Sequence, residues 1–244
     1  METHPIKHAI VLHVFYRDLW QEFKPYLEKI LADESVHLYV TIVNDLDEYP
    51  IENLEGLVDL ATKIYYVENR GYDIGPFLTV MQDIRNKDYN TITKLHTKKS
   101  LHNGWDLSWG ANWRKDLYKP LIGHPKLFQF CIEQLQQPKI GMIGSKKYFY
   151  GDEKDQKHRD LLPSSLLAVN QLLKKHIPWN GGFISGTMFI IKTELLLSLF
   201  DKVTDLKELV YHFPLNEGKH TIAHAFERIF GYWTKYQEQE VGLI

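Results

Sequence analysis

Three short apolar runs alternate with two segments of helical periodicity at the start of the chain, and this alternation limits the possible folds more than any other feature. The apolar runs cover residues 8–16, 36–43 and 64–67, and the segments 19–31 and 52–62 between them have the pattern of helices. Strands that alternate with helices form parallel sheets through right-handed crossovers. The sequence therefore predicts an α/β fold with a Rossmann-like first half.

The later part of the chain continues this pattern. We expect strands at 91–95 and 140–143, a further apolar strand ending near residue 192, and helices over 114–137 and 221–233. Helices should flank a mostly parallel sheet.

In two segments the apolar residues show neither helical nor strand periodicity. Residues 102–113, rich in Trp, Gly and Asn, favour an ordered loop, and the charged segment 150–160 favours a surface loop or mobile lid. Because neither an internal repeat nor a linker stands out, we expect residues 1–244 to form a single domain.

Composition and charge exclude several classes of protein. A net charge of -2 argues against a nucleic-acid binder, since such domains are usually strongly basic. The single cysteine, Cys131, fits a reducing compartment. No apolar run reaches the roughly 18 residues of a membrane span, so we expect a cytoplasmic protein, with any membrane contact peripheral. Dinucleotide binding and P-loop phosphotransfer are disfavoured because G-x-G-x-x-G after the first run and G-x-x-x-x-G-K-[ST] are missing.

Two polar clusters follow apolar runs. Asn69, Arg70 and Gly71 lead to Asp73 at the predicted start of a helix over 74–85. Open α/β sheets bind ligands at this strand-to-helix edge, and free N–H groups at a helix start favour an anion. The second cluster, 94–99, is rich in lysine. Together the clusters suggest a phosphate-bearing substrate, although a tight capped turn and a solvated basic turn remain the simpler alternatives.

Five blocks of the sequence stand out, in the order His13-Val14-Phe15-Tyr16, Glu68-Asn69-Arg70-Gly71-Tyr72-Asp73-Ile74-Gly75-Pro76-Phe77, Lys94-Leu95-His96-Thr97-Lys98-Lys99-Ser100, Gly186-Thr187-Met188-Phe189 and Ala223-His224-Ala225-Phe226-Glu227-Arg228. Taken together, they resemble the rhamnan synthesis protein F family, which acts in building bacterial rhamnose-containing polysaccharides. The resemblance implies a GT-A-like glycosyltransferase fold, a nucleotide-sugar donor and a growing glycan, free or lipid-linked, as acceptor. It also implies a nucleotide-binding half at residues 1–100 and an acceptor-side half at 101–244.

The resemblance assigns the donor to the ends of the first strands and to the two polar clusters. The residues expected to contact the donor are His13, Tyr16, Thr41, Asn44, Asn69, Arg70, Gly71, His96, Lys98 and Lys99.

A metal site is not expected. Many GT-A enzymes hold a divalent metal with an Asp-x-Asp motif after the fourth strand, and here His96, Thr97 and Lys98 occupy that place. Charged lysines cannot ligate a cation, but they can neutralise a diphosphate directly. We therefore expect transfer without a metal cofactor and leave Mg²⁺ or Mn²⁺ as the alternative.

Glycosyl transfer with inversion needs a group that removes the proton of the acceptor hydroxyl. Glu227 is the first candidate for this catalytic role, since it follows the Gly-rich strand as the catalytic acid does in inverting GT-A enzymes, and Asp73 is the second. Glu227 could instead pair with Arg228, and Asp73 could only cap its helix. The expected acceptor-binding residues are Trp105, Trp109, Gly186, Thr187 and His224.

The sequence leaves open the role of three tryptophans and the choice between an enzyme and a binding subunit. Trp105, Trp109 and Trp113 are spaced by four, which fits a core stripe on a helix as well as a sugar-stacking platform. A non-catalytic nucleotide- or carbohydrate-binding subunit of a biosynthetic complex is the main alternative to an enzyme that transfers rhamnose or another deoxyhexose to a cell-surface polysaccharide.

Overall fold

The computed structural model describes residues 6–44, 54–99, 107–215 and 221–244. These residues form one seven-stranded sheet in the order β3-β2-β1-β4-β8-β5-β9 and a two-stranded sheet of β6 and β7. Among the described strands of the large sheet, only β8 runs opposite to the others. The strands are β1 His8–Val14, β2 Val36–Val43, β3 Lys63–Val67, β4 Thr91–His96, β5 Ile140–Gly144, β6 Phe149–Tyr150, β7 Phe183–Ile184, β8 Phe189–Lys192 and β9 Glu240–Leu243.

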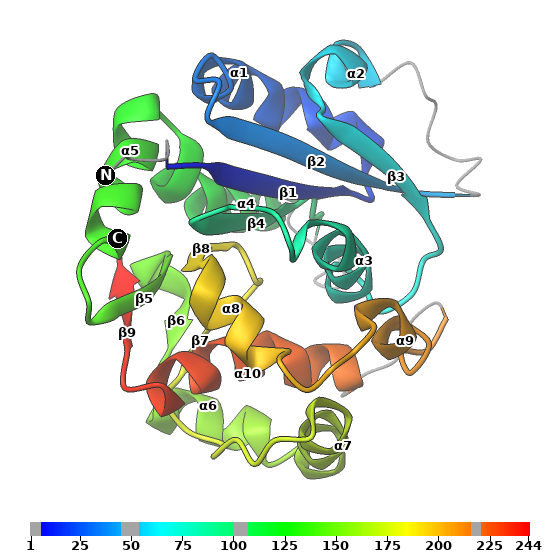
Figure 1. The fold of residues 1–244 in the computed structure, drawn as a ribbon, viewed down its shortest axis with the longest axis vertical. Coiled ribbons are helices and arrows are strands. Elements are labelled where there is room, and N and C mark those ends of the chain that lie inside the picture. The colour runs from blue at the N-terminus through cyan, green and yellow to red at the C-terminus, as the bar shows by residue number, and fades with distance from the viewer. Residues whose placement is uncertain (1–5, 45–53, 100–106, 216–220) are drawn as a thin grey trace.

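Helices lie on both sides of the large sheet (Figure 1). One group consists of α1, α4 and α5, which pack together, and a second group is formed by α3, α8, α9 and α10. The helices are α1 Trp20–Ile30, α2 Leu57–Leu60, α3 Ile74–Ile84, α4 Leu107–Ile122, α5 Pro125–Leu135, α6 Asp152–Arg159, α7 Pro163–Leu173, α8 Thr193–Leu199, α9 Leu206–Val210 and α10 Ile222–Tyr236. The prediction of a mostly parallel α/β sheet flanked by helices is confirmed.

The register of the central strands determines where polar side chains meet. In the parallel pairs, His13 of β1 lies opposite Thr41 of β2 and His96 of β4. Strands β1 and β4 are buried along their whole length, as expected of interior strands covered on both faces. Polar residues at their carboxyl ends are therefore brought to one edge of the sheet.

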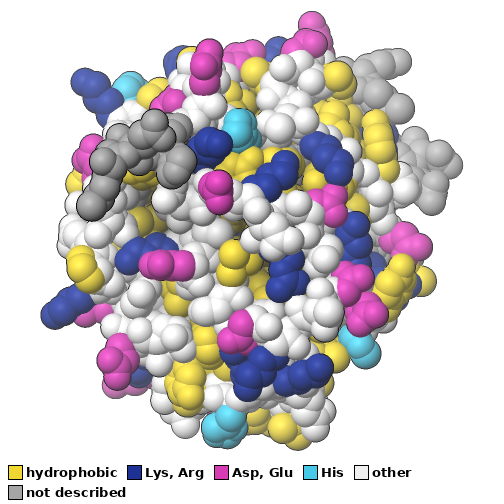
Figure 2. Space-filling model, in the orientation of Figure 1, with side chains coloured by type: hydrophobic (Ala, Val, Ile, Leu, Met, Phe, Trp, Pro, Cys, Tyr) yellow, Lys and Arg dark blue, Asp and Glu magenta, His cyan; other side chains and the backbone are white. Residues whose placement is uncertain are grey.

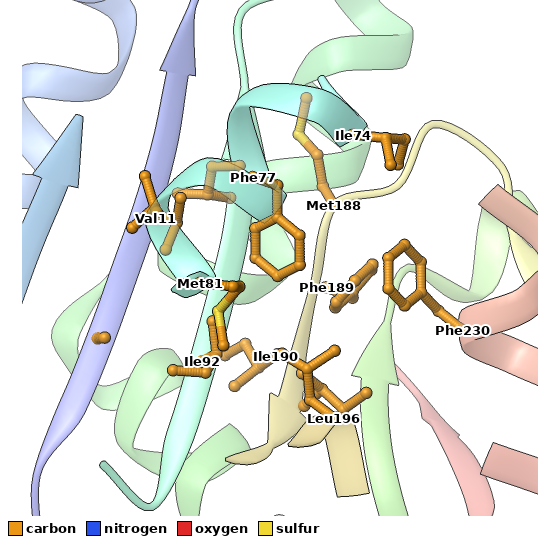
Figure 3. Packing of buried hydrophobic residues seen from close by; sticks show 14 of the residues in the cluster. Val11, Ile74, Phe77, Met81, Ile92, Met188, Phe189, Ile190, Leu196 and Phe230 are labelled. Carbon is orange, nitrogen blue, oxygen red and sulfur yellow. The ribbon is translucent and has the colours of Figure 1, made fainter. Parts of the chain in front are cut away.

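The core beneath this edge is packed by side chains of α3, β4, β8 and α10. Figure 3 shows Phe77 and Met81 of α3 beside Ile92, Phe189 and Phe230. Each of these side chains is almost completely buried, and the rings of Phe189 and Phe230 lie 5.2 Å apart. This packing holds the start of α3 against strands from both halves of the chain.

Two expectations about loops are wrong. The expected loop at 102–113 is helical from residue 107, because α4 buries Leu117, Leu121 and Ile122 in the core. The expected lid at 150–160 contains α6, which is anchored by the fully buried Asp155. Its carboxylate accepts hydrogen bonds from Arg228 and Tyr232, which are distant in sequence, so local periodicity could not reveal this anchor.

In the described part of the chain, no helix is both long and apolar enough to cross a membrane. On the face drawn in Figure 2, acidic and basic side chains are interspersed, in line with the small net charge.

Candidate active site

A cavity of about 500 Å³ opens at the carboxyl edge of β1 and β4. Its walls come from the turn before α3, the residues after β4, the turn before β8 and the start of α10. The predicted site residues that line it are His13, Tyr16, Asn69, Gly71, Asp73, His96, Lys98, Lys99, Gly186, Thr187, His224 and Glu227. The structure thus brings together the two polar clusters and the two later blocks.

Several predicted residues lie elsewhere. Thr41 is fully buried behind the cavity, where its hydroxyl is 2.9 Å from Nδ1 of His13. Asn44 is exposed past the end of β2 and does not line the cavity. Trp105 lies outside the described residues, and Trp109 lies on α4, where its side chain is not described. Trp113, one turn further along α4, does line the cavity.

Arg70 differs most from its expected role, because its guanidinium serves a neighbouring loop. Nη1 donates to the carbonyl of Phe213 at 2.9 Å, and Nε lies 3.3 Å from the Glu68 carboxylate. The Arg70 backbone also forms an isolated antiparallel bridge with Leu215. The structure therefore places Arg70 as a support for the loop that carries Pro214, a lining residue, and not in the cavity.

Asp73 is bound by a buried lysine that the sequence pattern did not single out as a site residue. Its Oδ2 accepts hydrogen bonds from Nζ of Lys94 and from the hydroxyl of Thr187. Asp73 occupies the N-cap position of α3, but its side chain makes no capping hydrogen bond. Burial alone would raise the pKa of Asp73, but the charge of Lys94 and these hydrogen bonds lower it far below its ordinary value. Asp73 is therefore an ionised group that is already paired.

Glu227 is positioned by a glycine of the turn before β8. The backbone N–H of Gly186 donates to Oε1 of Glu227 at 2.7 Å, and Oε2 lies 3.6 Å from Nη1 of Arg228. Arg228 makes its closer ion pair with Asp155, at 2.9 Å. Glu227 is thus a partly exposed carboxylate that reaches the cavity, with Arg228 held mainly by another partner.

Two lysines after β4 differ in their surroundings. Nζ of Lys99 lies 2.7 Å from the Asp18 carboxylate. Nζ of Lys98 lies 4.3 Å from the ring centroid of Trp113, and no carboxylate within the described ranges pairs with it. The Lys98 backbone is held by Arg114, a buried residue of α4 whose guanidinium also pairs with Glu22 at 2.6 Å. Of these two lysines, Lys98 is the one whose charge is not paired with a carboxylate in the described ranges.

His13 and His96, two of the histidines that line the cavity, are buried and neutral. Burial, which disfavours the charged imidazole, outweighs the nearby charge of Asp73 and lowers the pKa of His13 to about 3 and that of His96 to about 4. Nε2 of His96 donates to the carbonyl of Gly186 at 2.7 Å. Both rings can therefore offer neutral hydrogen-bonding groups to a ligand.

The free energy of unfolding should fall as the pH drops from 6.5 towards 5. In that range the unfolded chain binds protons at His13 and His96 that the folded chain does not, so each histidine contributes a loss of up to about 1.4 kcal/mol per pH unit. Urea unfolding at several pH values measures the slope. The His13→Asn variant should show a shallower slope than the natural chain, and an equal slope would contradict the assignment.

A second, shallower hollow of about 550 Å³ lies between α4, α5 and residues 145–147. Four lysines line it, but it contains none of the predicted site residues, so the cavity at the sheet edge is the better candidate for an active site.

The fold and the cavity together define the class of protein. It is an α/β protein with a polar, partly cationic cavity at the carboxyl edge of a mostly parallel sheet. The particular family follows from comparison with known proteins. The family model described as "Rhamnan synthesis protein F" matches residues 1–239, and the chain belongs to this family.

Two curated relatives are both described as "Uncharacterized protein WxcX", from Xanthomonas campestris pv. campestris strains B100 and ATCC 33913. Each is 27% identical over 231 residues, which is 91% of this chain and 30% of the relative. The chain therefore spans less than a third of the length of these relatives.

Solved structures with a similar layout include a mannosyltransferase, PcManGT from Pyrobaculum calidifontis in complex with GDP-Man and Mn²⁺. It has a TM-score of 0.43 and 14% identity over 99% of this chain and 55% of that one. S. aureus TarS 1-349 has a TM-score of 0.42 and 9% identity over 93% and 55%. A mycobacterial protein has a TM-score of 0.39 and 12% identity over 79% and 55%.

Proposed function

We propose that this chain is a glycosyltransferase that moves a sugar from a nucleotide-sugar donor to a bacterial cell-surface polysaccharide. The observation that carries the proposal is the cavity itself, where Lys98 and Glu227 line the same space although they come from opposite halves of the chain. A cation suits a leaving diphosphate, and a carboxylate suits an attacking hydroxyl. Membership of the rhamnan synthesis family supports a polysaccharide as the product.

The mechanism follows from these two groups. An acceptor hydroxyl attacks the anomeric carbon of the donor sugar, and its proton passes to the carboxylate of Glu227. The bond from the anomeric carbon to the diphosphate oxygen breaks, and the nucleoside diphosphate leaves with the bonding electrons. The ammonium of Lys98 stabilises the negative charge that develops on the diphosphate. The residues around His13, Tyr16 and Asn69 would hold the nucleoside.

The carboxylates of the cavity do not fit a divalent metal. Such an ion needs several oxygen ligands, and the lining carboxylates are Asp73 and Glu227. Asp73 is already bound by Lys94 and Thr187, and Glu227 is bound by the N–H of Gly186. Among the residues that the structure describes, no group of three His, Cys, Asp or Glu is placed to hold a metal ion. We therefore propose that cationic side chains neutralise the diphosphate.

The finer assignments belong to the same proposal. The family supports rhamnose or another deoxyhexose as the sugar. Residues 1–100 would form the nucleotide-binding half and residues 101–244 the acceptor-side half of one catalytic domain. Trp113 and His224, which line the cavity near Glu227, would contact the acceptor. We also propose that transfer takes place in the cytoplasm, where a lipid-linked acceptor would bring it to the inner face of the membrane.

A nucleotide-sugar panel tests the proposal. A ligand that binds only the folded state raises the free energy of unfolding, by about 2.7 kcal/mol when its concentration is one hundred times the dissociation constant. The apparent melting temperature rises as a result. We expect one nucleoside diphosphate deoxyhexose to stabilise the chain most, and the purified chain to release its nucleoside diphosphate when an acceptor is added. Stabilisation without turnover on any acceptor would favour the non-catalytic binding subunit. No stabilisation by any donor would contradict both the transferase and a nucleotide-binding subunit.

A further inference from the structure

We propose that Lys94 is a positioning residue that orients Glu227 and His96 through the turn formed by Gly186 and Thr187. The inference rests on the proposed function for its kinetic consequences, whereas its structural part concerns contacts that can be measured without turnover. Lys94 does not line the cavity, so it acts through other residues and not on a substrate.

The ammonium of Lys94 is buried, since the Lys94 side chain is only 1% exposed. Nζ donates to Oδ2 of Asp73, to the Thr187 hydroxyl at 3.1 Å and to the Thr187 carbonyl at 3.3 Å. A buried ammonium is tolerated only when it is paired and hydrogen-bonded. These contacts use its three donor hydrogens, so Lys94 strongly favours the one arrangement of Thr187 that satisfies it.

The backbone of Thr187 has an unfavourable conformation. Its φ of +47° lies in the left-handed region, which is unfavourable for a β-branched residue. A conformation of this kind persists only when the surroundings hold it in place. Here the Thr187 hydroxyl donates to Asp73 and accepts from Lys94, and the carbonyl accepts from Lys94 as well. The ion pair therefore stabilises a turn that would otherwise relax.

Gly186 connects this turn to Glu227 and His96. Gly186, the residue before Thr187, donates its N–H to Oε1 of Glu227 and accepts from Nε2 of His96, both at 2.7 Å. Its own φ is +93°, and a Cβ here would lie 2.6 Å from a methyl carbon of Leu117, so glycine is required. If the turn relaxed, Glu227 and His96 would lose these partners together.

A buried ion pair can also serve stability alone, and the Thr187→Val and Thr187→Ser variants separate the two roles. Valine keeps the shape of threonine, but its side chain cannot hydrogen-bond to Lys94 or Asp73, so only the carbonyl bond to Lys94 remains, whereas serine keeps the hydroxyl. Because misplacement of a catalytic group by about 1 Å can lower the rate 100-fold, we expect Thr187→Val to lower kcat by about 10- to 100-fold. The KM for the donor should change less than about twofold, and Thr187→Ser, which restores the hydroxyl, should recover most of the kcat that Thr187→Val loses.

Lys94 itself is tested with Lys94→Met alone and in the double variant Lys94→Met with Asp73→Asn. The single variant leaves Asp73 buried without its cation, so it can fail to fold for that reason. The double variant removes both charges, and we expect it to fold and still show the loss in kcat. A double variant with natural kcat would overturn the proposal.

A measurement that needs no turnover completes the test. In a sample labelled with ¹⁵N-histidine, the protonated Nε2 of His96 should shift in Thr187→Val, because the bond to the Gly186 carbonyl is weakened, and should not shift in Thr187→Ser. An unchanged signal in Thr187→Val, or equal losses of stability, donor binding and kcat, would overturn the proposal. If the natural chain shows no transfer but the signal shifts as expected, the proposed function fails and the positioning role stands.

Discussion

Replacing Glu227 with glutamine should lower turnover by about 10²- to 10⁴-fold and leave donor binding close to its natural strength. The amide cannot take up the proton of an acceptor hydroxyl, whereas its carbonyl oxygen can still accept the N–H of Gly186 that now bonds to Oε1. The fold around residue 227 should therefore survive the change. Steady-state kinetics give kcat, and calorimetric titration with the donor gives the dissociation constant.

The Asp73→Asn variant is the matched comparison for Glu227→Gln. Asp73 also lines the cavity, but its carboxylate is bound by Lys94 and Thr187, and its lowered pKa makes it a poor proton acceptor. Asp73→Asn should mainly reduce stability, since it removes one partner of a buried ion pair, a change that typically costs about 3–5 kcal/mol. Near-natural turnover in Glu227→Gln, with loss of turnover in a folded Asp73→Asn, would move the catalytic role to Asp73.

Replacing Lys98 with methionine should lower kcat/KM by about 100-fold or more. The ammonium of Lys98 faces the cavity without a carboxylate partner in the described ranges, so its full charge is available to a diphosphate. Losing one group that stabilises developing charge typically costs about 10²- to 10³-fold. Methionine removes the charge that lies over the Trp113 ring but keeps an unbranched side chain beside it. The measurement is kcat/KM for the donor at fixed, saturating acceptor.

Two controls accompany the Lys98 prediction. Lys98→Arg retains a cation and should keep more activity than Lys98→Met. Lys99→Met should have a smaller effect, because Lys99 is already paired with Asp18. A loss in Lys99→Met equal to that in Lys98→Met would show that Lys98 has no special role. Transfer that stops in EDTA and returns with Mg²⁺ or Mn²⁺ would contradict the idea that lysine replaces a metal.

The elements with strong periodicity could be predicted from the sequence. The strand at 36–43 agrees with β2, and the expected strand and helix on either side of the Asn69 cluster agree with β3 and α3. The short strand β9, by contrast, was not predicted. Its four residues carry little periodicity and become a strand by pairing with β5.

The composition of the candidate site was predictable to a similar degree. Most residues expected in the cavity line it, because the ends of parallel strands meet at one edge of a sheet. Arg70 does not, although it stands between two residues that do. The sequence shows its charge but not the loop carbonyl of Phe213 that binds it, which lies far along the chain.

Local patterns of apolar and polar residues determined the α/β class and the order of the first strands, since both depend on neighbours in sequence. Only the tertiary structure decided that Lys94 is buried against Asp73 and Thr187, and that Glu227 meets the N–H of Gly186. These contacts join residues from separate parts of the chain. A buried charge is acceptable only where the folded chain supplies its partners, and no local pattern shows which partners those are.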